Sequence, residues 1–176
     1  AICRLKRVTY DYKDDISGLL PKPETMNGKK IALIGGGPAS LTVARDLALT
    51  GYECTLFEKD PQAGGLMRTN IPSFRLPEEV LNEEVDQVLN LGIKTEFNSE
   101  ITSMKNMLDK DFDAIFVGTG APKGRDINIE GREEADSNVH IGIDWLTSIA
   151  FEHTKSIGKK VIVLGGGNTA MDCCRT

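Results

Sequence analysis

Two short glycine-rich turns hold the residues of this sequence that could do chemistry. The first reads GGGPAS over 35–40, and Gly35 and Gly37 fill the first two places of the pattern G-x-G-x-x-[G/A]. A glycine at the first place allows a tight turn, and one at the second lets a diphosphate approach the backbone closely. Ser40 stands at the third place, where glycine or alanine is usual. We expect this turn to hold the diphosphate of a dinucleotide.

The residues around the first turn supply the context that such a motif needs. Residues 31–34 form a continuous apolar run, which is typical of a strand buried on both faces of a parallel sheet. Apolar residues recur at helical spacing over 41–48, so the turn precedes a helix whose free N–H groups favour phosphate. Glu58 follows Gly37 by 21 positions, at the end of the next expected strand, where a carboxylate can bind a ribose diol. The alternative is a unit that binds no phosphate, with Glu58 as a solvated strand end.

A second turn of the same kind lies near the end of the sequence. A strand is expected over 161–164, and Gly165, Gly167 and Ala170 fill the three small positions that follow it. A chance repetition of a strand and glycines is the alternative interpretation. The residue that would distinguish NAD from NADP would lie beyond Thr176, so this choice stays open.

Strands and helices alternate between the two turns. Strands are expected at 31–34, 52–57, 93–97 and 114–117. Pro77 begins a helix with an apolar stripe, and Gly92 ends it. The loop over 60–77 is too long for a simple connector. This alternation predicts an α/β fold, with a Rossmann-like parallel sheet and helices on both faces.

The overall composition argues against several classes of partner. The chain has 176 residues and a formal net charge of −5, which does not favour nucleic acid or an anionic membrane surface. No apolar run approaches the roughly 20 residues that a membrane-spanning helix needs. The four cysteines show neither CxxC spacing nor a disulfide framework, so we expect reduced thiols and a cytoplasmic protein. The sequence offers no catalytic triad, no metal cluster and no paired carboxylates.

Four stretches of the sequence resemble one group of flavoproteins. They are GGGPAS, FEKDPQAGGLMRTNIPSFRLP, VGTGAP and VIVLGGGNTAMDC. Together they resemble the small (beta) chain of NADPH-dependent glutamate synthase. They are also similar to the flavin region of dihydropyrimidine dehydrogenase and to related bacterial iron–sulfur flavoproteins. The resemblance runs from about Lys29 to the end, and the GGL…IP.F.LP stretch is more specific than either glycine turn.

This resemblance implies roles for individual residues. The residues implied to contact FAD are Gly35, Gly36, Gly37, Pro38, Ala39 and Ser40 in the diphosphate loop, Glu58 and Lys59 at the adenosine ribose, Gly65 and Leu66 along the flavin, Arg75 near the cofactor, Ile101 at the adenine, and Gly118, Thr119 and Gly120 in a turn beside FAD. Those implied to contact NADP or NAD are Gly165, Gly166, Gly167, Asn168 and Thr169. No catalytic residue and no metal ligand is implied.

Simpler interpretations of three of these features stay open. The loop over 60–77 could be a surface connector, and 118–120 could be an ordinary turn. Arg75 could pair with Glu78 or Glu79.

The resemblance also implies how the chain is organised. Residues 1–28 would be a helix and linker that follow an absent iron–sulfur region, and 29–125 would be the first FAD-binding segment. Residues 126–158 would be a connector, and 159–176 the truncated start of an NAD(P)-binding domain. The 4Fe-4S clusters would lie only in the absent region, with Cys3 outside their ligand set. The chain begins without methionine, so we expect a piece of a longer protein.

The implied function is that of an FAD-dependent oxidoreductase subunit of the glutamate synthase small-chain type. It would pass electrons from NAD(P)H through FAD to iron–sulfur centres, with an iron–sulfur domain or a large catalytic subunit as its partner. We expect the isolated segment to be inactive. Two alternatives are a flavin-binding electron-transfer module without turnover of its own, and a single-site NAD(P)-dependent dehydrogenase.

Overall fold

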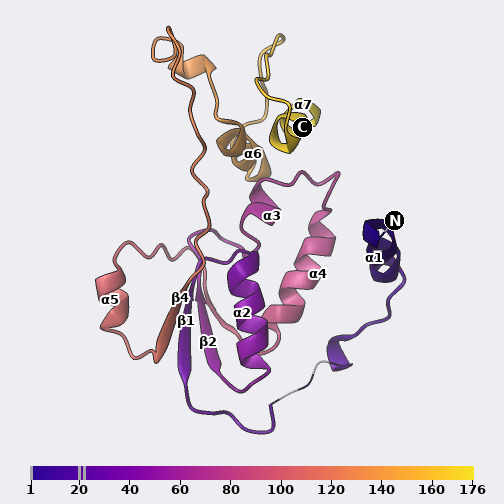
Figure 1. Ribbon diagram of the computed structural model, residues 1–176, viewed down its shortest axis with the longest axis vertical. Coiled ribbons are helices and arrows are strands. Elements are labelled where there is room, and N and C mark those ends of the chain that lie inside the picture. Colours follow the sequence, from indigo (N-terminus) through magenta and orange to yellow (C-terminus); the bar gives the residue numbers. More distant parts are fainter. Residues whose placement is uncertain (1, 20, 22) are drawn as a thin grey trace.

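A parallel sheet forms the centre of the protein, in a computed structural model that describes residues 2–19, 21 and 23–176 (Figure 1). Its strands are β1 (Lys30–Ile34), β2 (Glu53–Phe57), β3 (Lys94–Glu96) and β4 (Ala114–Val117). Their order in the sheet is β3-β2-β1-β4, and each neighbouring pair is parallel. The predicted α/β fold with a parallel sheet is confirmed.

Helices connect the strands and extend beyond them. They are α1 (Ile2–Asp11), α2 (Pro38–Ala48), α3 (Leu66–Thr69), α4 (Glu78–Leu89), α5 (Met104–Leu108), α6 (Gly142–Ala150) and α7 (Asn168–Arg175), with short 3-10 helices at Ser17–Leu19 and Asp136–Asn138. The predicted helix after Pro77 is α4, and Gly92 follows it with a φ of +96°, a conformation that favours glycine.

The central strand β1 is buried on both faces, as its continuous apolar run predicts. Ile31 and Leu33 belong to a core cluster with side chains of α2 and α4. Ala32 and Ile34 point to the opposite face, where they pack with Met107 of α5. Helices therefore cover both faces, and the alternation along one strand separates the two halves of the core.

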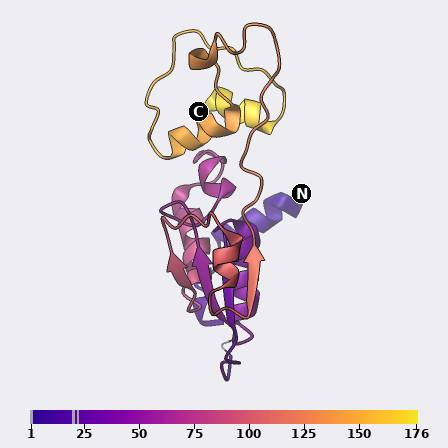
Figure 2. The ribbon, with the colours of Figure 1, turned by 90° about the vertical axis from the view of Figure 1, so that its left-hand side faces the viewer.

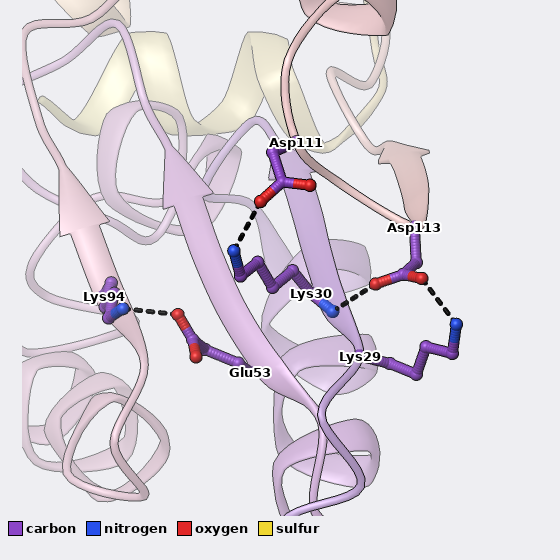
Figure 3. Close-up of polar contacts among 6 residues, drawn as sticks. All are labelled: Lys29, Lys30, Glu53, Lys94, Asp111 and Asp113. Atoms are coloured by element: carbon purple, nitrogen blue, oxygen red, sulfur yellow. Dashed lines mark hydrogen bonds and ion pairs between the residues drawn. The ribbon is translucent and has the colours of Figure 1, made fainter.

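Ion pairs join the strands at the amino end of the sheet (Figure 3). Lys29 Nζ lies 2.7 Å from Asp113 Oδ1, and Lys30 Nζ lies 2.6 Å from Asp111 Oδ2. Lys94 pairs with Glu53 between β3 and β2. Because all of these groups are exposed, each pair contributes little to stability. The charged groups lie at the end of the sheet opposite the first glycine turn.

The expected strand over 161–164 is wrong. This segment is extended, but no neighbouring strand pairs with it in the part of the chain that the structure describes. Ile162 is 87% exposed and Leu164 is 72% exposed. A parallel strand needs a neighbour for its backbone hydrogen bonds, and β1 already pairs with β2 and β4.

The C-terminal helices lie beyond the sheet. In Figures 1 and 2, α6 and α7 sit together on the far side of α3 from the strands. The Cys173 thiol of α7 donates a hydrogen bond of 3.6 Å to the carbonyl oxygen of Gly142, the first residue of α6. Within the described ranges, no helix is long and apolar enough to cross a membrane.

Candidate functional site

The first glycine turn begins directly after β1. Gly35 has a φ of +91°, and its N–H donates a hydrogen bond of 2.8 Å to the carbonyl oxygen of Phe57 in β2. A Cβ added at Gly35 would lie 2.8 Å from the carbonyl oxygen of Gly118, which is backbone and cannot move aside easily. The tight turn therefore requires glycine here both by conformation and by contact.

Glu58 lies at the end of β2 and its carboxylate reaches the turn. It is only 5% exposed. Its Oε2 accepts a hydrogen bond of 2.5 Å from the N–H of Gly36, and its Oε1 accepts one of 2.9 Å from the N–H of Asp60. The alternative of a solvated strand end is wrong. These two hydrogen bonds orient the carboxylate. Each oxygen keeps a further lone pair, so it can still accept a hydrogen bond from a hydroxyl group.

The N-terminus of α2 is open to a ligand at Gly37. This residue caps the helix with a φ of −77°, and a Cβ added there would meet no atom within 4 Å. Pro38 stands at the first helical position, where its missing N–H is not needed. The N–H groups of the first turn have no intrahelical acceptor, so they can bind an anion.

The loop that follows β2 packs against this opening. A Cβ added at Gly65 would lie 2.8 Å from the Cα of Gly37, so only glycine allows this approach. Leu66 follows it as the first residue of α3, and its side chain is exposed. The loop over 60–77 is thus in contact with the glycine turn.

The turn after β4 lies against the same place. Gly118 donates a hydrogen bond of 2.8 Å to the carbonyl oxygen of Ile34, and a Cβ added at Gly118 would overlap the Ser40 hydroxyl. The chain continues from β1 to β2 on one side of β1, whereas β4 pairs with the other side of β1. The carboxyl end of β1 is therefore the switch point of the sheet, which is where open α/β folds bind ligands.

Ser40 is fully buried, and its Oγ has no hydrogen-bond partner within the described residues. It packs beneath the turn instead of facing the opening, which explains why a small residue is needed at the third place. Its backbone N–H, but not its hydroxyl, belongs to the first turn of α2.

Arg68 is a residue of this site that sequence reasoning missed. Its Nε donates a hydrogen bond of 2.8 Å to the carbonyl oxygen of Ala63, and its Nη2 donates one of 2.8 Å to Asn82 Oδ1 of α4. The side chain is only 9% exposed. Arg68 therefore holds the Gly64–Gly65 turn against α4. No spacing could identify it, because its first acceptor is a backbone carbonyl group, which every residue has.

Arg75 does not pair with Glu78 or Glu79. Its Nη1 lies 2.5 Å from Asp172 Oδ2 of α7, 97 positions later. Asp172 was not singled out by any sequence pattern, because only the packing of α7 on this loop brings the two groups together.

The remaining predicted residues lie in several separate places. Lys59 is exposed beside Glu58, and Ile101 is half-buried against the β1 face that α5 covers. Thr119 and Gly120 are exposed after β4. Gly165, Gly166, Gly167, Asn168 and Thr169 form an exposed turn and the start of α7, away from the sheet.

The first turn fits the diphosphate and ribose of a dinucleotide. A backbone free of Cβ atoms, a helix N-terminus and an oriented buried carboxylate meet at the switch point. The second turn has the same local form, with Gly165 at a φ of +134° and Gly167 as the cap of α7.

The chain is similar to several known proteins. The model of the family described as pyridine nucleotide-disulphide oxidoreductase matches residues 29–176. The beta subunit of an NADP(+)-dependent formate dehydrogenase from Moorella thermoacetica is 39% identical over 153 residues, covering 85% of this chain and 22% of that protein. The glutamate synthase [NADPH] small chain of Bacillus subtilis is 34% identical over 191 residues, covering 100% of this chain and 38% of that protein.

A solved complex of 2-naphthoyl-CoA reductase shares the fold. Its TM-score is 0.68 at 24% identity, over 90% of this chain and 23% of that one. The expected resemblance to the glutamate synthase small chain is confirmed. The chain spans 22% to 38% of the length of the two curated relatives.

Proposed function

The chain belongs to the pyridine nucleotide-disulphide oxidoreductase family, and on that premise we propose that it supplies the first FAD-binding segment of an NAD(P)H-dependent oxidoreductase subunit. Members of the family bind FAD and NAD(P). The observation that carries the proposal is the opening at Gly37, with the Glu58 carboxylate held beside it by the Gly36 N–H.

The residues of the first turn would hold the adenosine diphosphate half of FAD. The N–H groups of Gly37, Ala39 and Ser40 would bind the diphosphate at the N-terminus of α2. Glu58, oriented by two backbone N–H groups, would accept hydrogen bonds from the ribose hydroxyls. Gly65 and Leu66 would pass along the flavin. Bound FAD would supply the acceptor of the hydride, and the protein positions it.

The second turn would open the NAD(P) site. We propose that 29–125 forms the FAD segment, 126–158 a connector, and 159–176 the start of the NAD(P)-binding region. The N–H groups of the first turn of α7, next to Gly166 and Gly167, would bind the dinucleotide phosphates.

Electrons would pass from NAD(P)H through FAD to iron–sulfur centres. The relatives reported above include proteins named as a beta subunit and a small chain, which supports a partner chain for this one. We propose an iron–sulfur domain or a large catalytic subunit as that partner, in the cytoplasm. A single-site dehydrogenase is less well supported, because the Gly65 loop and the second glycine turn have no role in it.

Substitution of Gly37 by alanine tests the FAD site. The φ of −77° suits alanine and the added methyl would meet no protein atom, so stability should change by less than about 1 kcal/mol. The methyl group would enter the space that the FAD diphosphate would occupy. This overpacking should make the free energy of FAD binding less favourable by about 1–3 kcal/mol. We expect FAD to bind roughly tenfold to a hundredfold more weakly. Titration of the apoprotein with FAD, followed by flavin fluorescence, measures this in the full-length protein.

Gly167→Ala is the matched control, because Gly167 caps α7 with a φ of −85° and also has no atom near the added Cβ. This variant should keep its FAD and bind NAD(P)H more weakly. If both variants bind FAD as the wild-type protein does, the first turn does not hold the FAD diphosphate.

A further inference from the structure

The loop over 65–75 contacts α7 through two side-chain pairs. The Arg75 guanidinium lies 2.5 Å from the Asp172 carboxylate, which is only 6% exposed. The Arg175 guanidinium stacks 4.2 Å from the centre of the Phe74 ring. A carboxylate this deeply buried needs its partner, because an unpaired buried charge is strongly unfavourable. The contact is therefore a specific one.

The other end of the same loop lies on the first glycine turn. Gly65 approaches Gly37 so closely that a Cβ would lie 2.8 Å from the Gly37 Cα. Between the two ends, the Asn70 side chain donates a hydrogen bond of 2.9 Å to the carbonyl oxygen of Ile143 in α6. One loop thus connects the first turn with both C-terminal helices, as the position of α3 below α6 in Figures 1 and 2 shows.

Asp172 is connected to the second glycine turn through α7. It lies within α7, whose N-terminal cap is Gly167. An α-helix transmits position along its axis because each residue is fixed by hydrogen bonds to the next turn. Holding Asp172 therefore holds the N–H groups at the start of α7.

We propose that Asp172 is a positioning residue that acts through Arg75. The pair sets the separation and orientation of the two glycine turns, and through them of the two dinucleotides. This inference rests on the proposed function, in which a hydride leaves reduced nicotinamide, giving NAD(P)⁺, and adds to oxidised flavin, giving reduced flavin. A small misplacement of two reacting groups lowers the rate of such a step without weakening either binding site.

Asp172→Asn in the full-length protein tests the proposal. It removes the charge and keeps the shape, so we expect flavin reduction at saturating NAD(P)H to slow by about tenfold or more, with FAD content and NADP⁺ affinity unchanged. Asp172→Glu, which keeps the charge, should recover part of the rate. Asp144→Asn is the matched control, since it removes an exposed carboxylate from the neighbouring helix α6 and should leave the rate unchanged.

A second readout needs no cofactor. Spin labels on Cys174, which is exposed on α7, and on a cysteine replacing the exposed Asp46 of α2 report the distance between the two segments. Cys3 and Cys173 are changed to serine in this background. We expect a narrow distance distribution that broadens with Asp172→Asn and not with Asp144→Asn.

The outcomes separate this inference from the function on which it rests. A wild-type protein that binds no FAD would refute the proposed function. The spin-label distances would still test whether Asp172 holds the two segments in place, because they need no cofactor. A wild-type protein that reduces its flavin, together with an Asp172→Asn variant of unchanged rate and distances, would refute the positioning role alone. If Asp172→Asn does not fold, Arg75→Lys tests the geometry of the pair instead, because lysine keeps the charge and loses the guanidinium fork. A rate and a distance distribution equal to those of the wild-type protein would then refute the positioning role.

Discussion

Replacing Ser40 by alanine should stabilise the protein. Ser40 lies in the first turn of α2, is fully buried, and has an Oγ without a hydrogen-bond partner in the described part of the chain. A buried hydroxyl group that makes no hydrogen bond loses its interaction with water on folding and gains nothing in return. Alanine is also the residue that the G-x-G-x-x-[G/A] pattern allows at this place.

The size of the effect follows from three contributions. Removing the unsatisfied hydroxyl should recover about 1–3 kcal/mol. Alanine has a higher helix propensity than serine, by up to about 0.5 kcal/mol. The loss of the oxygen's packing contacts with the Gly118 turn opposes these gains, at about 0.1–0.2 kcal/mol per contact. We expect a net stabilisation of about 1–2 kcal/mol, which corresponds to a rise in Tm of roughly 2–8 °C.

Urea unfolding of the apoprotein, followed by far-UV circular dichroism, measures this change as a higher midpoint at an unchanged slope. Ser148→Ala is the matched control. The Ser148 hydroxyl lies 2.5 Å from the Thr154 hydroxyl and is half-buried, so its loss should destabilise the protein by about 1 kcal/mol. The same substitution thus has opposite signs at the two sites.

A lower midpoint for Ser40→Ala would refute this reasoning, because it would mean that the hydroxyl group has a favourable partner in the folded protein. If the loss occurred only with FAD bound, the hydroxyl would belong to the cofactor site and not to the packing beneath it.

Two further predictions concern ionisable groups. Burial raises the pKa of the Cys54 thiol to about 11. With Cys3 changed to serine, a thiol reagent at neutral pH should therefore label the exposed Cys174 quickly and Cys54 only when the protein unfolds. Labelling of both thiols at one rate would contradict the burial of β2. The pKa of Asp113 is lowered, and the hydrogen bond that its carboxylate accepts from Lys29 is the largest cause. The ionised Asp113 carboxylate therefore stabilises the folded protein above the ordinary aspartate pKa of about 3.9, and this stabilisation disappears as pH falls through the lowered value. Urea midpoints of wild type and Asp113→Asn should therefore differ by a small amount at neutral pH and converge in acid, and a gap that is constant with pH would contradict this.

Much of the candidate site is predictable from local sequence. The strand, the glycine turn and the helix that follows are adjacent in the chain, and Gly35 and Gly37 are restricted by backbone conformation and space that neighbouring residues define. The acid at the end of the next strand is also predictable, because parallel strands place their carboxyl ends at one edge of the sheet. The buried state of Glu58 is not, since it depends on the contact with Gly36.

The strand expected over 161–164 shows the limit of such reasoning. An apolar run states only that the side chains favour burial, whereas a strand also requires a partner for its backbone groups. The described residues bring no such partner to it.

The sequence by itself therefore determined the elements whose causes are local: the parallel-sheet units, the two glycine turns and the apolar faces of the helices. Only the tertiary structure decided which distant groups meet. Arg75 finds Asp172 instead of the nearby Glu78 or Glu79, and the Ser40 hydroxyl turns into the core beneath Gly118. The physical reason is that spacing along a chain specifies backbone geometry over a few residues, whereas the partners of a buried polar group depend on how complete elements pack.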